Sequence, residues 1–196
     1  MGSLHVLAAQ ALRLNREAGA PPIPSLYFFT DPVRTPDIAA IAQRLPRGAA
    51  VVYRHFGAKN RLATARQLAR VCRARGLILL IGADERLAQS VGAGVHWPER
   101  LAPPKRSQAP LVTVSAHTRE AVARACAIAD ACVLSPVFPT KSSSSGEALG
   151  LFAAGQIARE AKLPVIALGG VNAGNARLLT GHGFAGIAGI DAFLNV

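Results

Sequence analysis

A glycine pair after an apolar run is the first feature of the sequence that could bind a ligand. Residues Pro164–Gly170 read Pro-Val-Ile-Ala-Leu-Gly-Gly, and Phe184–Ile190 forms a second apolar run that contains glycine. Glycine backbone can approach a ligand closely, and exposed N–H groups at strand ends bind anions such as phosphate. Gly169-Gly170 is therefore a candidate anion site. The alternative is a pair of ordinary buried strands with tight turns.

Three other side chains could act on a ligand held by that backbone. His117 follows the apolar run Leu111–Ser115, and a histidine can move a proton near neutral pH. A loop or helix-capping role is the alternative for His117. Arg54 can bind a carboxylate or a phosphate with both arms of its guanidinium. His96 is either a cavity-lining residue or a core histidine with satisfied hydrogen bonds.

Eight short apolar segments predict the strands that would position these residues. They are Leu26–Thr30, Ala49–Arg54, Leu77–Ile81, Gly94–Trp97, Leu111–Ser115, Ala131–Val137, Pro164–Gly170 and Phe184–Ile190. Helices are expected at residues 3–18, 37–45, 60–75, 118–129, 149–161 and 173–181, with a very short one after Ile81. Strands that alternate with helices indicate an α/β fold with a parallel sheet, and eight of them indicate a (β/α)8 TIM barrel. Catalysis in such barrels takes place at the carboxyl ends of the strands.

The length of 196 residues predicts a shortened barrel, since about 250 residues is typical. We expect a single barrel domain over residues 1–196, with an extra N-terminal helix in residues 1–20 and the barrel in residues 26–190. The sequence leaves little room after Ile190, so no full final helix is expected. The leading helix would then cover the resulting gap or close the barrel floor.

The composition of the chain indicates which kind of molecule it binds. The net charge is +11, mostly from arginine, whereas aromatic residues make up only 5% of the chain. A nucleic-acid-binding protein often interleaves clustered basic residues with aromatics. We therefore expect solvated basic helix faces that favour small phosphorylated substrates, and no nucleic-acid partner.

Other features bear on the location of the protein. No apolar run approaches the roughly 20 residues that a membrane span needs, and the N-terminus lacks a signal-peptide pattern. The three cysteines have no metal-ligand spacing and are expected to be buried thiols. These features predict a cytoplasmic protein with no membrane partner. A homodimer is left open.

Taken in order, the strand ends resemble the thiamine-phosphate synthase family, including its thiazole tautomerase branch. The matching residues are Thr30-Asp31, Arg54, Gly94-Val95-His96, Ser115-Ala116-His117, Pro136–Thr140 and Leu168-Gly169-Gly170. The resemblance implies an enzyme of thiamin biosynthesis that binds a phosphorylated thiazole. It places the phosphate on Gly169, Gly170, Ala188 and Gly189, and makes His117 the catalytic acid–base. The resemblance and the hydroxyl-rich loop imply further substrate contacts from Arg54, Ser115, Thr140 and Ser142.

The sequence departs from this family where a synthase binds metal. Family synthases carry an Asn-Asp pair whose carboxylate holds Mg²⁺ on a pyrimidine pyrophosphate. The corresponding residues here are Gly82 and Ala83, and a methyl group cannot ligate a cation that requires oxygen. Asp84 and Glu99 are the available substitutes. We therefore predict no metal ligands and no cofactor, with Mg²⁺ needed only in a synthase.

Three functions follow from these observations. The favoured one is a metal-independent enzyme that, like a thiazole tautomerase, moves a proton on a thiazole phosphate. The first alternative is a thiamine-phosphate synthase that joins a pyrimidine pyrophosphate to a thiazole phosphate. Its substitute groups would be Asp84, Glu99, Lys59 and Lys141. The second alternative is a non-catalytic protein that binds a thiazole or thiamin phosphate.

Overall fold

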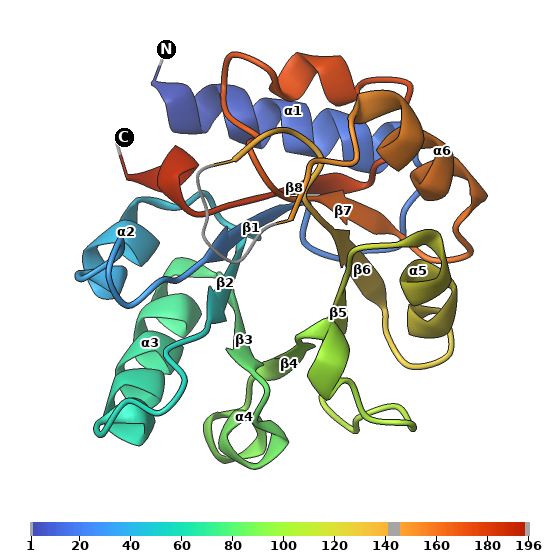
Figure 1. The fold of residues 1–196 in the computed structure, drawn as a ribbon. Helices are drawn as coiled ribbons and strands as arrows, with labels where there is room; N and C mark the ends of the chain where they lie inside the picture. Colours follow the sequence, from blue (N-terminus) through green and yellow to red (C-terminus); the bar gives the residue numbers. More distant parts are fainter. Residues whose placement is uncertain (1, 141–145, 195–196) are drawn as a thin grey trace.

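Eight parallel strands close into a barrel in chain order (Figure 1). The computed structural model describes residues 2–140 and 146–194. Within them the strands are β1 Leu26–Phe29, β2 Ala50–Tyr53, β3 Ile78–Gly82, β4 Gly94–Trp97, β5 Val112–Ala116, β6 Ala131–Leu134, β7 Val165–Ala167 and β8 Gly186–Gly189. β1 pairs with β8 as well as with β2, which closes the sheet. The predicted shortened TIM barrel is confirmed.

Six α-helices accompany the strands over the described residues. They are α1 Ser3–Glu17, α2 Ile38–Arg44, α3 Arg61–Arg75, α4 Glu85–Val91, α5 Arg119–Ala125 and α6 Leu151–Glu160. Three short 3-10 helices stand where a regular barrel has longer ones: η1 Glu99–Leu101 after β4, η2 Ala176–Leu179 after β7 and η3 Asp191–Phe193 after β8. The expectation that no full helix follows β8 is confirmed over the described part of the chain. None of the described helices combines the length and the apolar character of a membrane span.

The predicted helix at residues 173–181 is wrong, because local side-chain hydrogen bonds hold this segment in turns. The Asn172 carboxamide oxygen accepts from the N–H groups of Gly174 at 2.9 Å and Asn175 at 3.3 Å. The Asn175 oxygen accepts in turn from the Asn172 N–H at 2.8 Å. Such bonds offer the backbone an alternative to a helix. Only the short η2 forms within this fully described segment.

Two sets of apolar side chains give the barrel its core, because successive residues of a strand face opposite sides. One set fills the barrel interior and includes Tyr27, Phe29, Val52, Leu80, Val133 and Ile166. The other set packs between the sheet and the surrounding helices. The thiols of Cys72 and Cys132 are buried as expected, whereas Cys126 is half-buried. A filled interior leaves the ends of the barrel as the places where a ligand can bind.

The leading helix covers the gap left by the missing final helix. α1 lies against β8 and β1 on the outside of the barrel (Figure 1). It buries Leu7, Ala11 and Leu14. The Asn15 side-chain amide also donates to the Ala185 carbonyl oxygen at 3.3 Å, just before β8. Of the two positions considered for this helix, the structure therefore shows the first.

Because α1 supplies part of the core, truncating its buried face should destabilise the whole barrel. The Leu14 side chain is 1% exposed, and Leu12 on the same helix is 58% exposed. We expect Leu14→Ala to lower the free energy of unfolding by about 2–5 kcal/mol. Leu12→Ala should change it by less than about 0.5 kcal/mol. Urea denaturation of the two variants checks this, and a change of less than about 0.5 kcal/mol in Leu14→Ala would contradict it.

Candidate functional site

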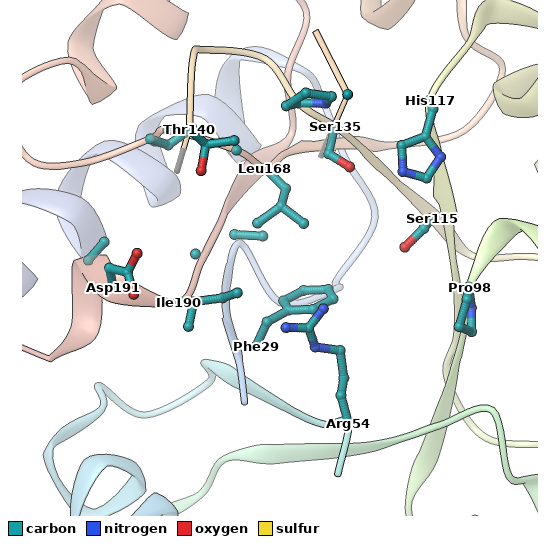
Figure 2. A pocket seen from close by; sticks show the side chains of 18 of the residues that line it. Phe29, Arg54, Pro98, Ser115, His117, Ser135, Thr140, Leu168, Ile190 and Asp191 are labelled. Atoms are coloured by element: carbon teal, nitrogen blue, oxygen red, sulfur yellow. The ribbon is translucent and has the colours of Figure 1, made fainter. Parts of the chain in front are cut away.

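The carboxyl ends of the strands surround a cavity of about 1440 Å³ (Figure 2). Its base is apolar and includes Phe29, Leu168 and Ile190, which pack with the side chains that fill the barrel. Every predicted site residue that the structure describes lines this cavity: Arg54, Ser115, His117, Thr140, Gly169, Gly170, Ala188 and Gly189. Ser142 lies outside the described residues. The folded chain thus gathers these residues from five separate strand ends at one opening.

Figure 2 shows how the labelled side chains face each other. Ser115 and His117 stand on one side of the cavity, whereas Thr140 and Asp191 stand on the opposite side. The Arg54 side chain extends between the two sides. A ligand that spans the cavity would therefore reach all three groups of residues.

Arg54 is a half-buried cation that has no carboxylate in contact among the described residues. Its Nε donates to the Thr30 carbonyl oxygen at 3.0 Å, and its carbon Cζ lies 5.3 Å from the centre of the Phe29 ring. None of the ion pairs among the described residues includes Arg54. Burial lowers the pKa of the guanidinium, and the field of Asp31 opposes this effect. A buried charge is costly unless it is paired, so this position favours an anionic ligand.

His117 is held by a neighbouring carboxylate. Glu99 Oε2 accepts from the His117 backbone N–H at 3.0 Å and lies 2.8 Å from the ring Nδ1. The other oxygen of Glu99 accepts from Arg124 at 3.0 Å. The residue that caps α5 is Thr118, whose hydroxyl oxygen accepts from the Ala121 N–H. The capping interpretation of His117 is therefore wrong, and the hydrogen-bonded loop interpretation describes its contacts.

Sequence reasoning considered Glu99 only as a substitute metal ligand and missed its contact with His117. The two residues are 18 positions apart. The signal that could have found the contact is the order of the strands: Glu99 follows β4 and His117 follows β5. β4 and β5 are neighbours in a parallel sheet, so their carboxyl ends lie side by side.

His96 is both a cavity-lining residue and a satisfied core histidine. Its side chain is 1% exposed; Nδ1 lies 2.9 Å from the Thr113 hydroxyl and Nε2 lies 3.0 Å from the Ser115 hydroxyl. Burial, with a smaller effect from Arg54, lowers the pKa of His96 to about 3. The ring is thus uncharged at neutral pH. It orients Ser115 and is poorly suited to accept a proton.

The structure shows why glycine is required at positions 169 and 170, which the sequence alone did not reveal. Gly169 and Gly170 have φ values of 93° and 65°, which disfavour any residue with a side chain. A Cβ on Gly169 would lie 2.7 Å from Pro136 Cα, and one on Gly170 would collide with the Pro139 carbonyl oxygen. The pair therefore allows the segment after β6 to pack closely. A bulky substitution at Gly170 would displace that segment as well as any ligand.

Within the described residues, the hydrogen bonds of Gly169 and Gly170 use their carbonyl oxygens and not their N–H groups. The Gly169 carbonyl oxygen accepts from the Phe138 N–H at 3.0 Å. The Gly170 carbonyl oxygen accepts from the side chains of Asn172 at 3.3 Å and Asn175 at 2.9 Å. Among the described residues, no hydrogen bond uses the Gly169 or Gly170 N–H as its donor. Two N–H groups beside an apolar base suit an anion such as phosphate.

The residues that could replace the metal ligands of a synthase are engaged elsewhere. Asp84 caps α4 by accepting from the Leu87 N–H at 2.9 Å, and its second oxygen accepts from Arg61 at 2.8 Å. Both oxygens of Glu99 are used by His117 and Arg124. Lys59 is exposed and Lys141 lies outside the described residues. The donors present at the ends of β3 and β4 do not fit a Mg²⁺ site.

The sequence also did not reveal an ion-pair cluster on the side of the cavity opposite His117. Arg34 donates to Asp31 at 3.0 Å and to Asp191 at 3.1 Å. Burial alone would raise the pKa of Asp31, but the N–H groups of Val33 and Arg34 and the Arg34 guanidinium lower it to about 2. Asp31 follows β1 and Asp191 follows β8. The cluster therefore ties the two strands at which the barrel closes.

Comparisons with known proteins agree with this geometry. Residues 26–193 match the family model described as thiamine monophosphate synthase. Thiamine-phosphate synthase from Geobacillus kaustophilus is 35% identical over 139 residues, which cover 66% of this chain and 62% of the relative. The enzyme of the same name from Bacillus velezensis is 29% identical over 184 residues, covering 86% and 82% of the two chains. The solved structure of thiamine phosphate pyrophosphorylase from Pyrococcus furiosus has a TM-score of 0.77 and 25% identity, over 89% of each chain.

Because His96 is uncharged in the folded protein, the free energy of unfolding should depend on pH. In the folded state the pKa of His96 is about 3, whereas the pKa of a histidine in an unfolded chain is about 6.5. Between these values the unfolded chain binds the additional proton, so stability is full above about pH 6.5 and falls as the pH is lowered. We expect His96 to contribute a loss of about 1.4 kcal/mol per pH unit in this window. Urea denaturation of the wild type and His96→Asn from pH 7 to pH 5 checks it, and parallel pH dependences would contradict it.

Proposed function

The chain belongs to the thiamine monophosphate synthase family, whose members act in thiamin biosynthesis, and on that premise we propose that it moves a proton on a thiazole phosphate without a metal ion. The observation that carries the proposal is the position of His117. Its ring, held by Glu99, lies across the cavity from the side on which Thr140 and Asp191 stand (Figure 2). That arrangement supports binding of a substrate at one wall and reaction at the other.

In this proposal the substrate phosphate lies on the N–H groups of Gly169 and Gly170. Ala188 and Gly189 of the neighbouring β8 line the same part of the cavity and would let the phosphate approach the backbone. Thr140 and Ser142 would add hydroxyl contacts. Backbone N–H groups bind a phosphate without a charged side chain, so the glycines hold the substrate and take no part in proton transfer.

The thiazole ring would rest on the apolar base, with its reacting edge toward His117. Phe29, Leu168 and Ile190 offer a surface for the ring and exclude water. Arg54, which has no anion of its own, would bind an anionic or electron-rich substituent of the ring. Ser115, oriented by His96, completes the polar side of the site.

The reaction is an isomerisation that needs no oxidant or reductant. His117 Nε2 accepts a proton from one ring position, and the electron pair of the broken bond moves into the conjugated system. The resulting imidazolium returns a proton to a second position of the same ring system. General acid–base catalysis of this kind contributes a factor of about 10² to 10⁴ in rate.

The names of the relatives favour a second candidate more than this one. The Geobacillus kaustophilus and Bacillus velezensis relatives are both called thiamine-phosphate synthases. By that analogy the chain would join a pyrimidine pyrophosphate to a thiazole phosphate. The joining reaction displaces pyrophosphate, which requires strong neutralisation of charge. The engagement of Asp84 and Glu99 speaks against this candidate.

Replacement of His117 tests the role assigned to it. We expect His117→Asn to lower kcat for the isomerisation of a thiazole phosphate by a factor of about 10² to 10⁴, with its Kd for thiazole phosphate nearly unchanged. His5→Asn, on the exposed face of α1, is the matched control and should behave like the wild type. Stopped assays and calorimetric titration measure the two quantities. Unchanged turnover in His117→Asn would refute the acid–base assignment, and binding without any turnover would leave a non-catalytic protein.

A joining assay separates the two candidate enzymes. The unaltered protein is incubated with a pyrimidine pyrophosphate and a thiazole phosphate, with Mg²⁺ and with a chelator. Because the donors at the ends of β3 and β4 do not fit Mg²⁺, we expect no joining above background in either condition and no tight binding of the pyrophosphate by calorimetry. Efficient Mg²⁺-dependent joining would establish the synthase.

A further inference from the structure

We propose that Glu99 is a positioning residue that holds the His117 ring with its proton on Nδ1 and its unprotonated Nε2 available to the substrate. The inference rests on the proposed function for its catalytic meaning, and on the hydrogen bonds of the site for its geometry. It assigns to Glu99 a role in proton transfer, in place of the metal-binding role considered from the sequence.

The hydrogen bonds of Glu99 determine which ring nitrogen of His117 carries the proton. A carboxylate can only accept hydrogen bonds. Oε2 lies 2.8 Å from Nδ1, so that nitrogen must be the donor. In the uncharged ring the proton is then on Nδ1, and Nε2 has a free electron pair. The same oxygen accepts from the His117 backbone N–H at 3.0 Å, which ties the ring to its own main chain.

Glu99 is itself held in place from two directions. Arg124 on α5 donates to Oε1 at 3.0 Å, so both oxygens are occupied. The short connection after β4 fixes the backbone, because Pro98 precedes the 3-10 helix that begins at Glu99. Glu99 is 24% exposed at the side chain, compared with 66% for Arg124. The carboxylate is therefore the more enclosed member of the pair and sits between the ring and solvent-facing Arg124.

This arrangement would assist both halves of a proton transfer. When Nε2 accepts a proton from the substrate, the ring becomes an imidazolium whose positive charge lies next to the Glu99 carboxylate. When Nε2 returns the proton, the ring reverts to the same neutral form, because Nδ1 keeps its own proton throughout. The carboxylate takes up no proton and exchanges no atoms with the substrate. It acts only through His117.

Glu99→Gln removes the negative charge with almost no change in shape, whereas Glu99→Leu removes both accepting oxygens. Three donors face the two oxygens of Glu99: the His117 N–H, Nδ1–H and Arg124. A glutamine has one accepting oxygen, so its NH₂ must face either Arg124 or His117. In the first case the support of Arg124 is lost, but the remaining oxygen still accepts from Nδ1–H and the position of the ring proton is kept. In the second case the amide donates to Nδ1 and forces the proton onto Nε2.

The first experiment observes the ring without any substrate. The ¹⁵N chemical shifts of the uncharged His117 ring report which nitrogen carries the proton, and comparison with His117→Asn identifies its signals. We expect the Nδ1–H form in the wild type and a shift toward the Nε2–H form in Glu99→Leu, which leaves Nδ1–H without its acceptor. Glu85→Gln is the matched control, because Glu85 accepts a backbone N–H from Gln108 outside the cavity. It should leave the His117 signals unchanged.

The second experiment measures turnover of thiazole phosphate. Glu99→Gln should lower kcat by a factor of about 10², which is within the usual range for acid–base catalysis. Its KM should change little, because Glu99 does not touch the phosphate in the proposed complex. Glu99→Asp keeps the charge at a shorter reach and should recover part of the loss. Glu85→Gln should match the wild type.

The outcomes separate this inference from the proposed function. If Glu99→Leu leaves the ¹⁵N pattern of His117 unchanged, Glu99 does not position the ring and the inference is overturned, whatever the turnover. If the pattern shifts but the wild type shows no turnover, the positioning by Glu99 holds and the proposed function fails. A shift in the pattern together with a loss of kcat supports both.

Discussion

The site depends on the closure of the sheet between β1 and β8. Leu26 pairs with Ile187 and Phe28 with Gly189, which places the first and last strand ends next to each other. Closure brings the bare backbone of β8 to the edge of a cavity whose base begins with Phe29. It also places Asp31 and Asp191 close enough for Arg34 to bridge them. Because α1 covers this seam, the shortened chain keeps a complete barrel.

The closed barrel then sets the electrostatics of the cavity. Electrostatic interactions are stronger in a water-poor site than in bulk water. Arg54 carries its charge over the Phe29 ring with no carboxylate in contact, and His96 beside it is uncharged. Over the part of the chain that the structure describes, a partly buried cation without a carboxylate partner and two glycine N–H groups without an acceptor suit an anionic ligand. The positions of these groups can therefore distinguish one anionic ligand from another, which the net charge of +11 cannot do.

The fold and the gathering of the site were predictable from local sequence, and the contacts within the site were not. Apolar runs and turn residues are local signals, and eight strands with helices between them have one common closed arrangement. The helix expected at residues 173–181 failed because the mutual hydrogen bonds of Asn172 and Asn175 compete with helical ones. The Glu99–His117 contact depends on the neighbouring strand, and the pKa of His96 depends on burial. Neither is encoded in the spacing of residues along the chain.

Contacts between residues far apart in the sequence also explain why the end of β3 differs from the glycine side of the cavity. At the end of β3, where the resemblance places the metal carboxylate of a synthase, Arg61 donates to the Gly82 carbonyl oxygen and to Asp84. Its guanidinium also lies 6.0 Å and 5.8 Å from the ring centres of Tyr53 and Phe56. A fixed cation thus neutralises the carboxylate that a divalent ion would need. Removing one member of such a partly buried pair leaves the other without its partner, so recruiting Asp84 to Mg²⁺ would disturb the start of both α3 and α4. The glycine side of the cavity, where we propose that the phosphate binds, requires no such change, because the N–H groups of Gly169 and Gly170 belong to the backbone.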